Sequence, residues 1–379
     1  MTGFRPFFLL ALAHALIAIG LWAAMLGGVL PTGLNRSVLW HAHEMLYGFA
    51  PAVVAGFLLT AVPHWTGTRS LGGWPLAGLA VLWLLGRIGA WNGATPPSPF
   101  GPAELLALAF LPVLAATVAV PILRTRNRRN YGIPALVLAL FAGQLLFLVG
   151  HRPAQAGTLT LDAYLVLMLV IGGRITPLFT RNALQRAGRR SDDIGAPAGL
   201  DRIALAAVLA TLALAHLDAP LRWVAIAALA AGALQLVRLP FWQGHRALAD
   251  PLVAVLHLGH AWIAATFLLR GYALLDPGIP NRAWIHAAGI GAMGTLILGV
   301  MTRVTLGHTG RPLVVPRTAW LALAAITAAA LARVGVAVTL LPRSPWLELS
   351  AAAWVLAFAL FGLFCTGKLL TERVDGRPG

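Results

Sequence analysis

The feature that most constrains this chain is a succession of apolar runs with few charged residues. A helix needs about 20 apolar residues to cross the hydrocarbon core of a bilayer. The sequence predicts an all-α polytopic membrane protein, with residues 1–379 forming a single transmembrane domain. Its twelve expected helices cover residues 8–30, 39–62, 74–94, 103–123, 132–150, 159–180, 201–217, 221–238, 251–272, 283–303, 318–341 and 346–370.

The charge balance favours membrane topology over nucleic-acid binding. Only 11% of the residues are charged, against roughly 25% in an ordinary soluble domain. The 28 Lys and Arg outnumber the 12 Asp and Glu, but they cluster in short loops, mostly after even-numbered runs. This asymmetry places both termini in the cytoplasm. The first run lacks a small-residue cleavage site, so we expect it to be retained as a helix.

Cysteine content limits the metal chemistry. Cys365 is the only cysteine, which excludes a disulfide framework, a Cys-rich zinc site and a c-type haem attachment motif. A metal would be held by His, carboxylate or Met, and a haem would be haem b.

An ionisable cluster opens the second run, where His41, His43 and Glu44 stand in an apolar segment. Ionisable groups in a membrane helix are expensive unless they are paired, and they indicate a functional site. His41 and His43 lie about 200° apart on a helix, so only an irregular turn would bring both to one metal. His41 and Glu44 share a face. Interfacial histidines bonded to backbone and water are the alternative.

His286 opens the tenth run at the same predicted outer level as this cluster. The predicted topology makes the second and tenth helices parallel. A flat cofactor between them could take one axial imidazole from each side, from His43 and His286. His41 and Glu44 would then be neighbours of the cofactor or ligands of a second metal, and Glu44 is a candidate catalytic residue.

His257 and His260 lie at i and i+3 on the ninth helix, near mid-depth. Two imidazoles on one face suit a transition metal such as copper. His257 could alternatively be a distal catalytic group, or one histidine could be a core residue with an accidental neighbour. Their level is on the order of 10 Å below His286, which favours two separate sites.

Arg174 and Arg303 lie near the inner ends of the sixth and tenth helices. They could bind haem propionates or another anion, or they could be snorkelling anchors.

The ends of the second, sixth and tenth helices resemble one another, over residues 60–67, 173–181 and 301–310. The spacing from Trp40 to His64 also equals that from Trp284 to His308. These features predict a pseudo-threefold repeat of four helices, with chance similarity as the alternative.

Five motifs together resemble the NnrS family over essentially the whole chain. They are FRPFF at 4–8, WHAHEMLYGF at 40–49, GFLLTAVP at 56–63, GGRITPLFTRN at 172–182 and VMTRVTLGHTGR at 300–311. The resemblance implies a bacterial inner-membrane protein that carries haem and copper and is linked to nitric oxide and denitrification or nitrosative stress. The matching positions are His41, His43, Glu44, Arg174, His257, His286, Arg303 and His308, whereas His64 and His260 depart from the family pattern.

The repeat also resembles the catalytic subunits of haem-copper oxidases and nitric oxide reductases. It departs from them because the sixth helix has no histidine and the seventh has only His216. We expect a protein that binds nitric oxide and detoxifies or reduces it as an oxidoreductase, with an electron donor that the sequence does not identify. The alternative is a transporter or a metal- and haem-handling protein without turnover.

Overall fold

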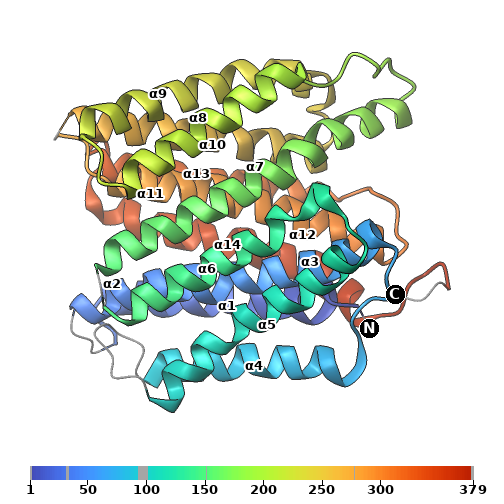
Figure 1. Cartoon of the computed structure of the whole chain (residues 1–379), viewed down its shortest axis with the longest axis horizontal. Coiled ribbons are helices and arrows are strands. Elements are labelled where there is room, and N and C mark those ends of the chain that lie inside the picture. The colour runs from blue at the N-terminus through green and yellow to red at the C-terminus, as the bar shows by residue number, and fades with distance from the viewer. Residues whose placement is uncertain (1, 31–33, 93–100, 151, 277, 377–379) are drawn as a thin grey trace. The chain divides into compact units, whose positions relative to one another are not determined.

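The computed structural model describes residues 2–30, 34–92, 101–150, 152–276 and 278–376, apart from the side chains of 34–37, 92 and 103. Within these residues it contains helices and no strand (Figure 1). In chain order they are α1 (Phe4–Leu26), α2 (Leu34–His43), η1 (Glu44–Phe49), α3 (Ala50–Thr66), α4 (Gly73–Asn92), α5 (Pro102–Arg124), η2 (Arg128–Asn130), α6 (Gly132–Leu148), α7 (Pro153–Arg186), α8 (Ala198–His216), α9 (Leu221–Arg238), η3 (Leu239–Trp242), η4 (Gly244–Ala247), α10 (Pro251–Leu275), α11 (Arg282–His286), η5 (Ala287–Gly294), α12 (Thr295–His308), α13 (Thr318–Ala337) and α14 (Arg343–Leu370).

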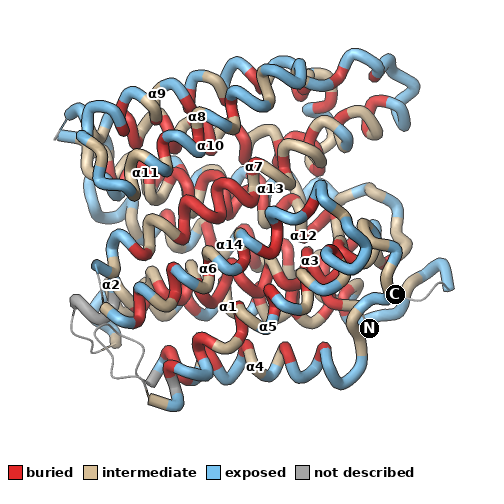
Figure 2. Tube along the Cα trace, in the orientation of Figure 1, coloured by how far each residue is buried: buried red, intermediate tan, exposed pale blue. Residues whose placement is uncertain are grey.

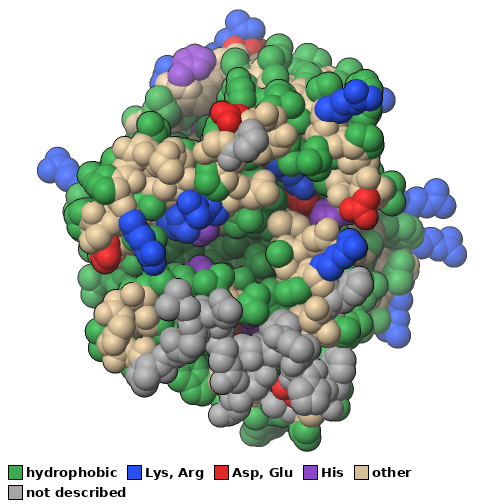
Figure 3. Space-filling view, turned by 90° about the vertical axis from the view of Figure 1, so that its left-hand side faces the viewer, with side chains coloured by type: hydrophobic (Ala, Val, Ile, Leu, Met, Phe, Trp, Pro, Cys, Tyr) green, Lys and Arg blue, Asp and Glu red, His purple; other side chains and the backbone are tan. Residues whose placement is uncertain are grey.

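Twelve helical stretches in the described chain are long and apolar enough to cross a membrane, which confirms the predicted all-α multi-pass class. The second span runs through α2, η1 and α3, and the tenth runs through α11, η5 and α12. The sixth span, Pro153–Arg186, extends beyond its predicted limits. The predicted end of the third helix, at 93–94, lies outside the described residues. On the face shown in Figure 3, charged side chains lie singly among hydrophobic ones.

Burial separates the spans into two groups. In the most apolar window of each span, 78%, 72%, 67% and 61% of the residues are buried in spans two, ten, nine and six. The other windows range from 22% to 44%, and Figure 2 shows mostly exposed residues along α4. Every residue predicted to carry chemistry lies on one of these four most buried spans.

The described chain divides into two compact units. Unit 1 comprises Met1–Ala163, Arg303–Leu313 and Phe361–Gly379, and unit 2 comprises Tyr164–Thr302 and Val314–Leu360. The prediction of a single domain over 1–379 and the predicted threefold repeat stay predictions.

Unit 1 is organised around the packing of α1 on α3, with α5 packed against α3, α4 and α6. Phe4, Phe8 and Leu58 are fully buried at its core. Arg5 ties the start of α1 to the end of α14, because its guanidinium donates to the carbonyl oxygen of Leu369 at 2.9 Å. That contact satisfies a backbone oxygen that the end of a helix leaves without an intrahelical donor.

Unit 2 contains α8, α9 and α10 packed in sequence, and α10 also contacts η5, α11 and α13. Close approach between α9 and α10 depends on small residues. A Cβ on Gly232 would lie 2.7 Å from Leu268, and one on Gly271 would lie 2.6 Å from Leu229. Small residues commonly allow such close packing of membrane helices.

Candidate functional site

Two of the most buried spans contain a π-helical segment, and each segment starts directly after a predicted haem ligand. The segment η1 follows His43, and η5 follows His286. A π-helix changes the angular register of the side chains along a helix, and it is frequent at functional sites. The sixth span, by contrast, has no π-helical segment within α7. The backbone therefore distinguishes the positions of His43 and His286.

In unit 1, three nitrogen-bearing side chains converge on the carboxylate of Glu44. Its Oε1 lies 2.8 Å from Nδ1 of His43 and 2.9 Å from Nη1 of Arg87. Its Oε2 lies 3.1 Å from Nε2 of His14. The four side chains are between 1% and 11% exposed. A carboxylate buried to this degree needs such partners, because desolvation of an unpaired charge would be prohibitive.

Gly48, in η1, makes room for this convergence. A Cβ there would lie 2.6 Å from Nε2 of His14 and 2.7 Å from Nη1 of Arg87. Both distances are too short for a real contact, so any larger residue would displace the two partners of Glu44. The carbonyl of Gly48 also accepts a hydrogen bond from Nε1 of Trp83 at 3.0 Å, which fixes α4 against η1.

The ring of His43 is oriented by Glu44 and leaves one nitrogen uncommitted. Because a carboxylate only accepts, Nδ1–H of His43 is the donor, and Nε2 carries the lone pair of the neutral ring. His43 is fully buried, and its Nε2 has no hydrogen-bond partner in the described part of the chain. The ring packs near Tyr47 and Phe147, with centroids 5.2 and 5.8 Å away. Tyr47 is itself held by a 2.7 Å hydrogen bond to Thr160.

His41 lies in a different environment from His43. Its ring stacks on Trp22 with centroids 4.6 Å apart and an angle of 11° between the planes. The two imidazoles therefore have different neighbours, as their spacing of two residues predicts. The assignment of His41 as a metal ligand stays a prediction.

In unit 2, His286 shows the same use of Nδ1 as His43. Its Nδ1–H donates to the backbone carbonyl of Arg282 at 2.7 Å. Metal-bound histidines commonly make this second bond to a carboxylate or a carbonyl, which fixes the tautomer and the orientation of the ring. His43 and His286 belong to different units, and their pairing across a cofactor stays a prediction.

His257 and His260 also lie in unit 2, on α10, against α7 and η3. Nε2 of His257 is 2.9 Å from Oγ1 of Thr180. The ring of Trp242 meets both imidazoles edge-on, with centroid distances of 4.7 Å to His260 and 6.2 Å to His257. We use the name α10 chamber for this group of packed side chains together with Thr176: Thr176, Thr180, Trp242, His257 and His260.

The α10 chamber holds several polar atoms that have no hydrogen-bond partner within the described residues. They are both ring nitrogens of His260, Nε1 of Trp242 and Oγ1 of Thr176. His260 is 2% exposed, and Thr176 is fully buried. Buried polar groups are normally satisfied by protein, ordered water or a ligand. Such a concentration of unsatisfied groups suits a small polar ligand or a metal ion.

Glycines allow the backbone to close around the chamber. A Cβ on Gly244 would lie 2.4 Å from Nδ1 of His257, and one on Gly172 would lie 2.7 Å from Nε2 of His260. Arg238 stacks over Trp242 at 4.5 Å and is paired with Asp201 at 2.6 Å. The carboxylate of Asp201 therefore compensates the charge of the guanidinium that lies against Trp242 of the chamber.

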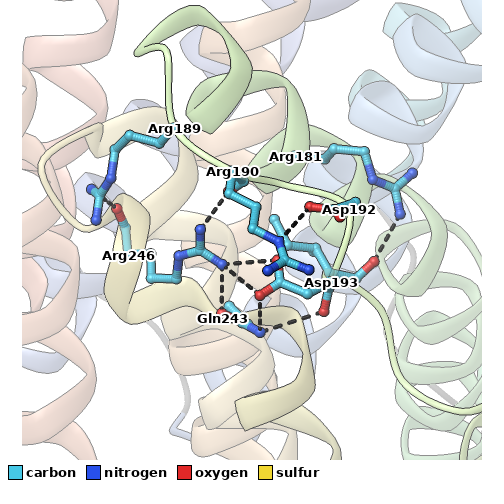
Figure 4. Close-up of polar contacts among 8 residues, drawn as sticks. Arg181, Arg189, Arg190, Asp192, Asp193, Gln243 and Arg246 are labelled. Atoms are coloured by element: carbon cyan, nitrogen blue, oxygen red, sulfur yellow. Dashed lines mark hydrogen bonds and ion pairs between the residues drawn. The ribbon is translucent and has the colours of Figure 1, made fainter.

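A surface network holds the segment that carries Gly244 (Figure 4). Nη1 of Arg246 lies 2.9 Å from both carboxylate oxygens of Asp193, and Gln243 donates to Asp193 at 3.2 Å. Hydrogen bonding from Arg246 lowers the pKa of Asp193, and hydrogen bonding from Arg190 lowers the pKa of Asp192. Gln243 directly precedes Gly244, and Arg246 lies in η4 together with Gly244. The network therefore holds the backbone of Gly244, against which the ring of His257 packs.

The remaining predicted residues lie as follows. Arg303 is 7% exposed and belongs to unit 1, whereas Arg174 is half-buried on α7 in unit 2. Their common role toward an anion stays a prediction. His308 lies in unit 1 with its ring 5.2 Å from that of His64. No group of three or more His, Cys, Asp or Glu side chains in metal-binding geometry occurs among the described residues.

The profile of one protein family, described as NnrS protein, matches residues 1–373. The chain belongs to the NnrS family. A search of curated proteins finds no match. The NnrS match covers all the spans that carry the Glu44 cluster and the α10 chamber. It confirms the family resemblance of the sequence motifs and leaves the roles of the individual residues as proposals.

Sequence reasoning missed five residues of these two sites: His14, Arg87, Thr176, Thr180 and Trp242. For Arg87 the signal was present, because an arginine inside an apolar run is itself a functional-site indicator. His14 likewise stands in the middle of the first span. Trp242, Thr176 and Thr180 carry no comparable signal, since aromatic and hydroxyl side chains are common in membrane helices.

Proposed function

We propose that this NnrS-family protein is a haem protein of the bacterial inner membrane, with both termini in the cytoplasm, that binds nitric oxide and detoxifies or reduces it. One observation carries the proposal. His43 donates from Nδ1 to Glu44, while its buried Nε2 has no partner in the described chain. This is the arrangement of a ligand-ready imidazole whose orientation and basicity are set by a carboxylate.

The residues around His43 fit a b-type haem. Nε2 of His43 would bind the iron, and the sequence prediction supplies His286 as the second imidazole. Tyr47 and Phe147 give the aromatic surroundings, and Arg303 and Arg174 are the predicted partners of propionates. A ferrous haem would supply an iron that binds small diatomic gases, at a position that one of the two imidazoles leaves open. Glu44 and Arg87 would keep the His43 ring fixed and supply charge close to the ligand.

The α10 chamber is the proposed second metal site. His257 and His260 are imidazoles at i and i+3, and both nitrogens of His260 are uncommitted in the described structure. Imidazole is a suitable donor for copper. Thr180 is hydrogen-bonded to Nε2 of His257. Copper would therefore bind His257 either at Nε2, after Thr180 releases it, or at Nδ1.

The test uses the purified full-length protein. Haem and copper are quantified per chain, and an absorption spectrum is recorded before and after reduction. Nitric oxide is then added in the presence of a reductant. A Soret band that shifts with nitric oxide is the expected result, whereas a metal-free protein with no Soret band would refute the proposal.

The same titration separates catalysis from binding. Consumption of many equivalents of nitric oxide per chain would support an oxidoreductase that draws electrons from a donor not yet identified. Consumption of one equivalent per haem would support the alternative of a transporter or a metal- and haem-handling protein.

A further inference from the structure

A groove on unit 1, separate from both candidate sites, combines an apolar floor with a cationic rim. Its volume is about 890 Å³. It is formed by α3, by α5, by the segment that joins α3 to α4 with the first residue of α4, and by Thr2, which lies two residues before α1. Its lining residues are Thr2, Leu58, Leu59, Val62, Pro63, Thr68, Arg69, Ser70, Leu71, Gly72, Gly73, Thr117, Val118, Val120, Pro121 and Arg124.

The rim of the groove is positively charged and uncompensated. Arg69 and Arg124 are both exposed, and the lining contains no Asp or Glu. Neither guanidinium has an ion pair or side-chain hydrogen bond within the described residues. Arg87 and Arg246, in contrast, are paired with Glu44 and Asp193. The two rim arginines are thus available to bind an anion.

Hydroxyl groups add polar contacts beside the arginines. Thr2, Thr68 and Ser70 line the groove. Oγ1 of Thr2 is buried and has no hydrogen-bond partner among the described residues. A phosphate ester offers several acceptor oxygens and therefore suits a groove that is lined by guanidinium and hydroxyl donors.

The floor of the groove is apolar and continues toward the lipid-facing surface. Leu58, Val62 and Val118 form its buried base, and the lining residues Pro63, Leu71 and Pro121 are partly exposed. On α5, Val120 is 46% exposed and extends the apolar surface outward. An inorganic anion would leave this floor unused, whereas an acyl chain would cover it.

Trp74 marks the depth of the rim in the membrane. It is 90% exposed at the first turn of α4, beside the groove residue Gly73. Exposed tryptophans of membrane proteins concentrate at the boundary between head groups and acyl chains. The arginine rim consequently lies at head-group level.

We propose that this groove binds an anionic phospholipid, with its phosphate at Arg69 and Arg124 and an acyl chain along the partly exposed Leu71, Val120 and Pro121. Basic pockets between membrane helices on the cytoplasmic side are known to select anionic head groups. The predicted topology places this end of α3 and α5 on that side.

The test measures lipid retention by the purified full-length protein in detergent, using native mass spectrometry. The probes are dioleoyl phosphatidylglycerol, dioleoyl phosphatidylcholine and inorganic phosphate. The variant is Arg69→Gln with Arg124→Gln. The matched control is Arg126→Gln with Arg128→Gln, which changes two exposed arginines close to α5 that do not line the groove.

We expect the groove variant to lower phosphatidylglycerol retention about tenfold or more, and the control to leave it unchanged. Phosphatidylcholine should bind weakly to all three proteins. Equal loss in variant and control, or equal retention of the two lipids by the parent protein, would overturn the proposal. Displacement of phosphatidylglycerol by millimolar inorganic phosphate would also overturn it, because the site would then be one for a free anion.

A second variant tests the acyl portion while keeping both arginines. Thr117→Phe places a ring in the groove from α5. It should reduce phosphatidylglycerol retention and leave haem content at the parental level. Unchanged retention in this variant would place the lipid outside the groove. Lipid retention is measured without reference to haem or nitric oxide, so failure of the lipid proposal and failure of the proposed function are distinguishable.

Discussion

The imidazoles of His43 and His260 are almost equally buried, at 0% and 2% exposure, yet their surroundings differ. His43 is held by the charged Glu44, whose carboxylate also contacts Arg87 and His14. His260 lies against an aromatic edge and has neither nitrogen committed in the described chain. The first environment fixes one tautomer and exposes one lone pair. The second leaves a neutral ring able to offer either nitrogen.

The comparison indicates two different ligand preferences. An imidazole bonded to a carboxylate is a stronger donor, and this suits an axial ligand of haem iron. A pair of neutral imidazoles in a chamber without a carboxylate suits a softer ion such as copper. Each site also depends on glycine, with Gly48 in the Glu44 cluster and with Gly244 and Gly172 beside the α10 chamber.

The largest effect is expected from Glu44→Ala. The substitution removes the acidic partner of the largely buried Arg87 guanidinium, and breaking such a pair is worth about 3–5 kcal/mol. Loss of the group that orients His43 should also lower haem affinity about 10- to 100-fold. Thermal unfolding and haem content measure the two effects. Glu348→Ala, at an exposed position of α14, is the control, and similar haem contents in both variants would remove Glu44 from the site.

Gly48→Ala should disrupt the same cluster without removing a charge. The added Cβ would force His14 and Arg87 away from Glu44, and overpacking of this kind costs about 1–3 kcal/mol. Haem content should fall while copper content stays at the parental level. Gly78→Ala, where a Cβ meets no atom within 4 Å, serves as the matched variant. A parental haem content in Gly48→Ala would show that haem binding does not require His14 and Arg87 to contact Glu44.

Gly244→Ala should give the reciprocal result. Its Cβ would collide with the ring of His257, so copper content should fall at a similar cost in stability of about 1–3 kcal/mol, while the Soret band is retained. The control is Gly199→Ala on α8, where the added Cβ has open space. Simultaneous loss of haem and copper would mean that the two sites are coupled, which would contradict their description as separate sites.

The smallest effect is expected in the surface network of Figure 4. Because Arg246 lowers the pKa of Asp193, the stabilisation from this pair is present above the ordinary pKa of Asp, about 3.9. It is lost as the pH falls through the lowered pKa. Hydrogen exchange of residues 187–197, corrected for intrinsic rates, should accelerate about two- to fivefold over that range. In the Asp193→Asn variant, residues 187–197 should exchange at the faster rate already at pH 7. If their exchange rate in this variant depends on pH as it does in the parent, the assignment to Asp193 is wrong.

The sequence was sufficient for the spans and for part of each site. Hydropathy predicts the twelve spans because each has to satisfy its own backbone hydrogen bonds in lipid. The bond between His43 and Glu44 joins neighbours in the sequence. The convergence of His14 and Arg87 on Glu44 depends on how α1 and α4 pack against η1, and no local pattern encodes it. The π-helical segments also escaped prediction, because the apolar pattern of a span is compatible with either helix type.

The α10 chamber shows the same limit. The spacing of His257 and His260 predicts a shared face of α10. Their neighbours Thr180 and Trp242 come from α7 and η3, about 80 and 15 residues away in the chain, respectively. Which ring nitrogens remain uncommitted is a property of this packing and not of the sequence.

The most direct test of the central claim is the absorption spectrum of purified His43→Ala, recorded beside His245→Ala. His245 is exposed and lies outside both sites, so the second variant controls for the loss of an imidazole. The account predicts that the Soret absorbance per chain falls about tenfold or more in His43→Ala, stays parental in His245→Ala, and is partly restored by free imidazole. A parental Soret band in a folded His43→Ala protein would contradict the assignment of His43 as the haem ligand.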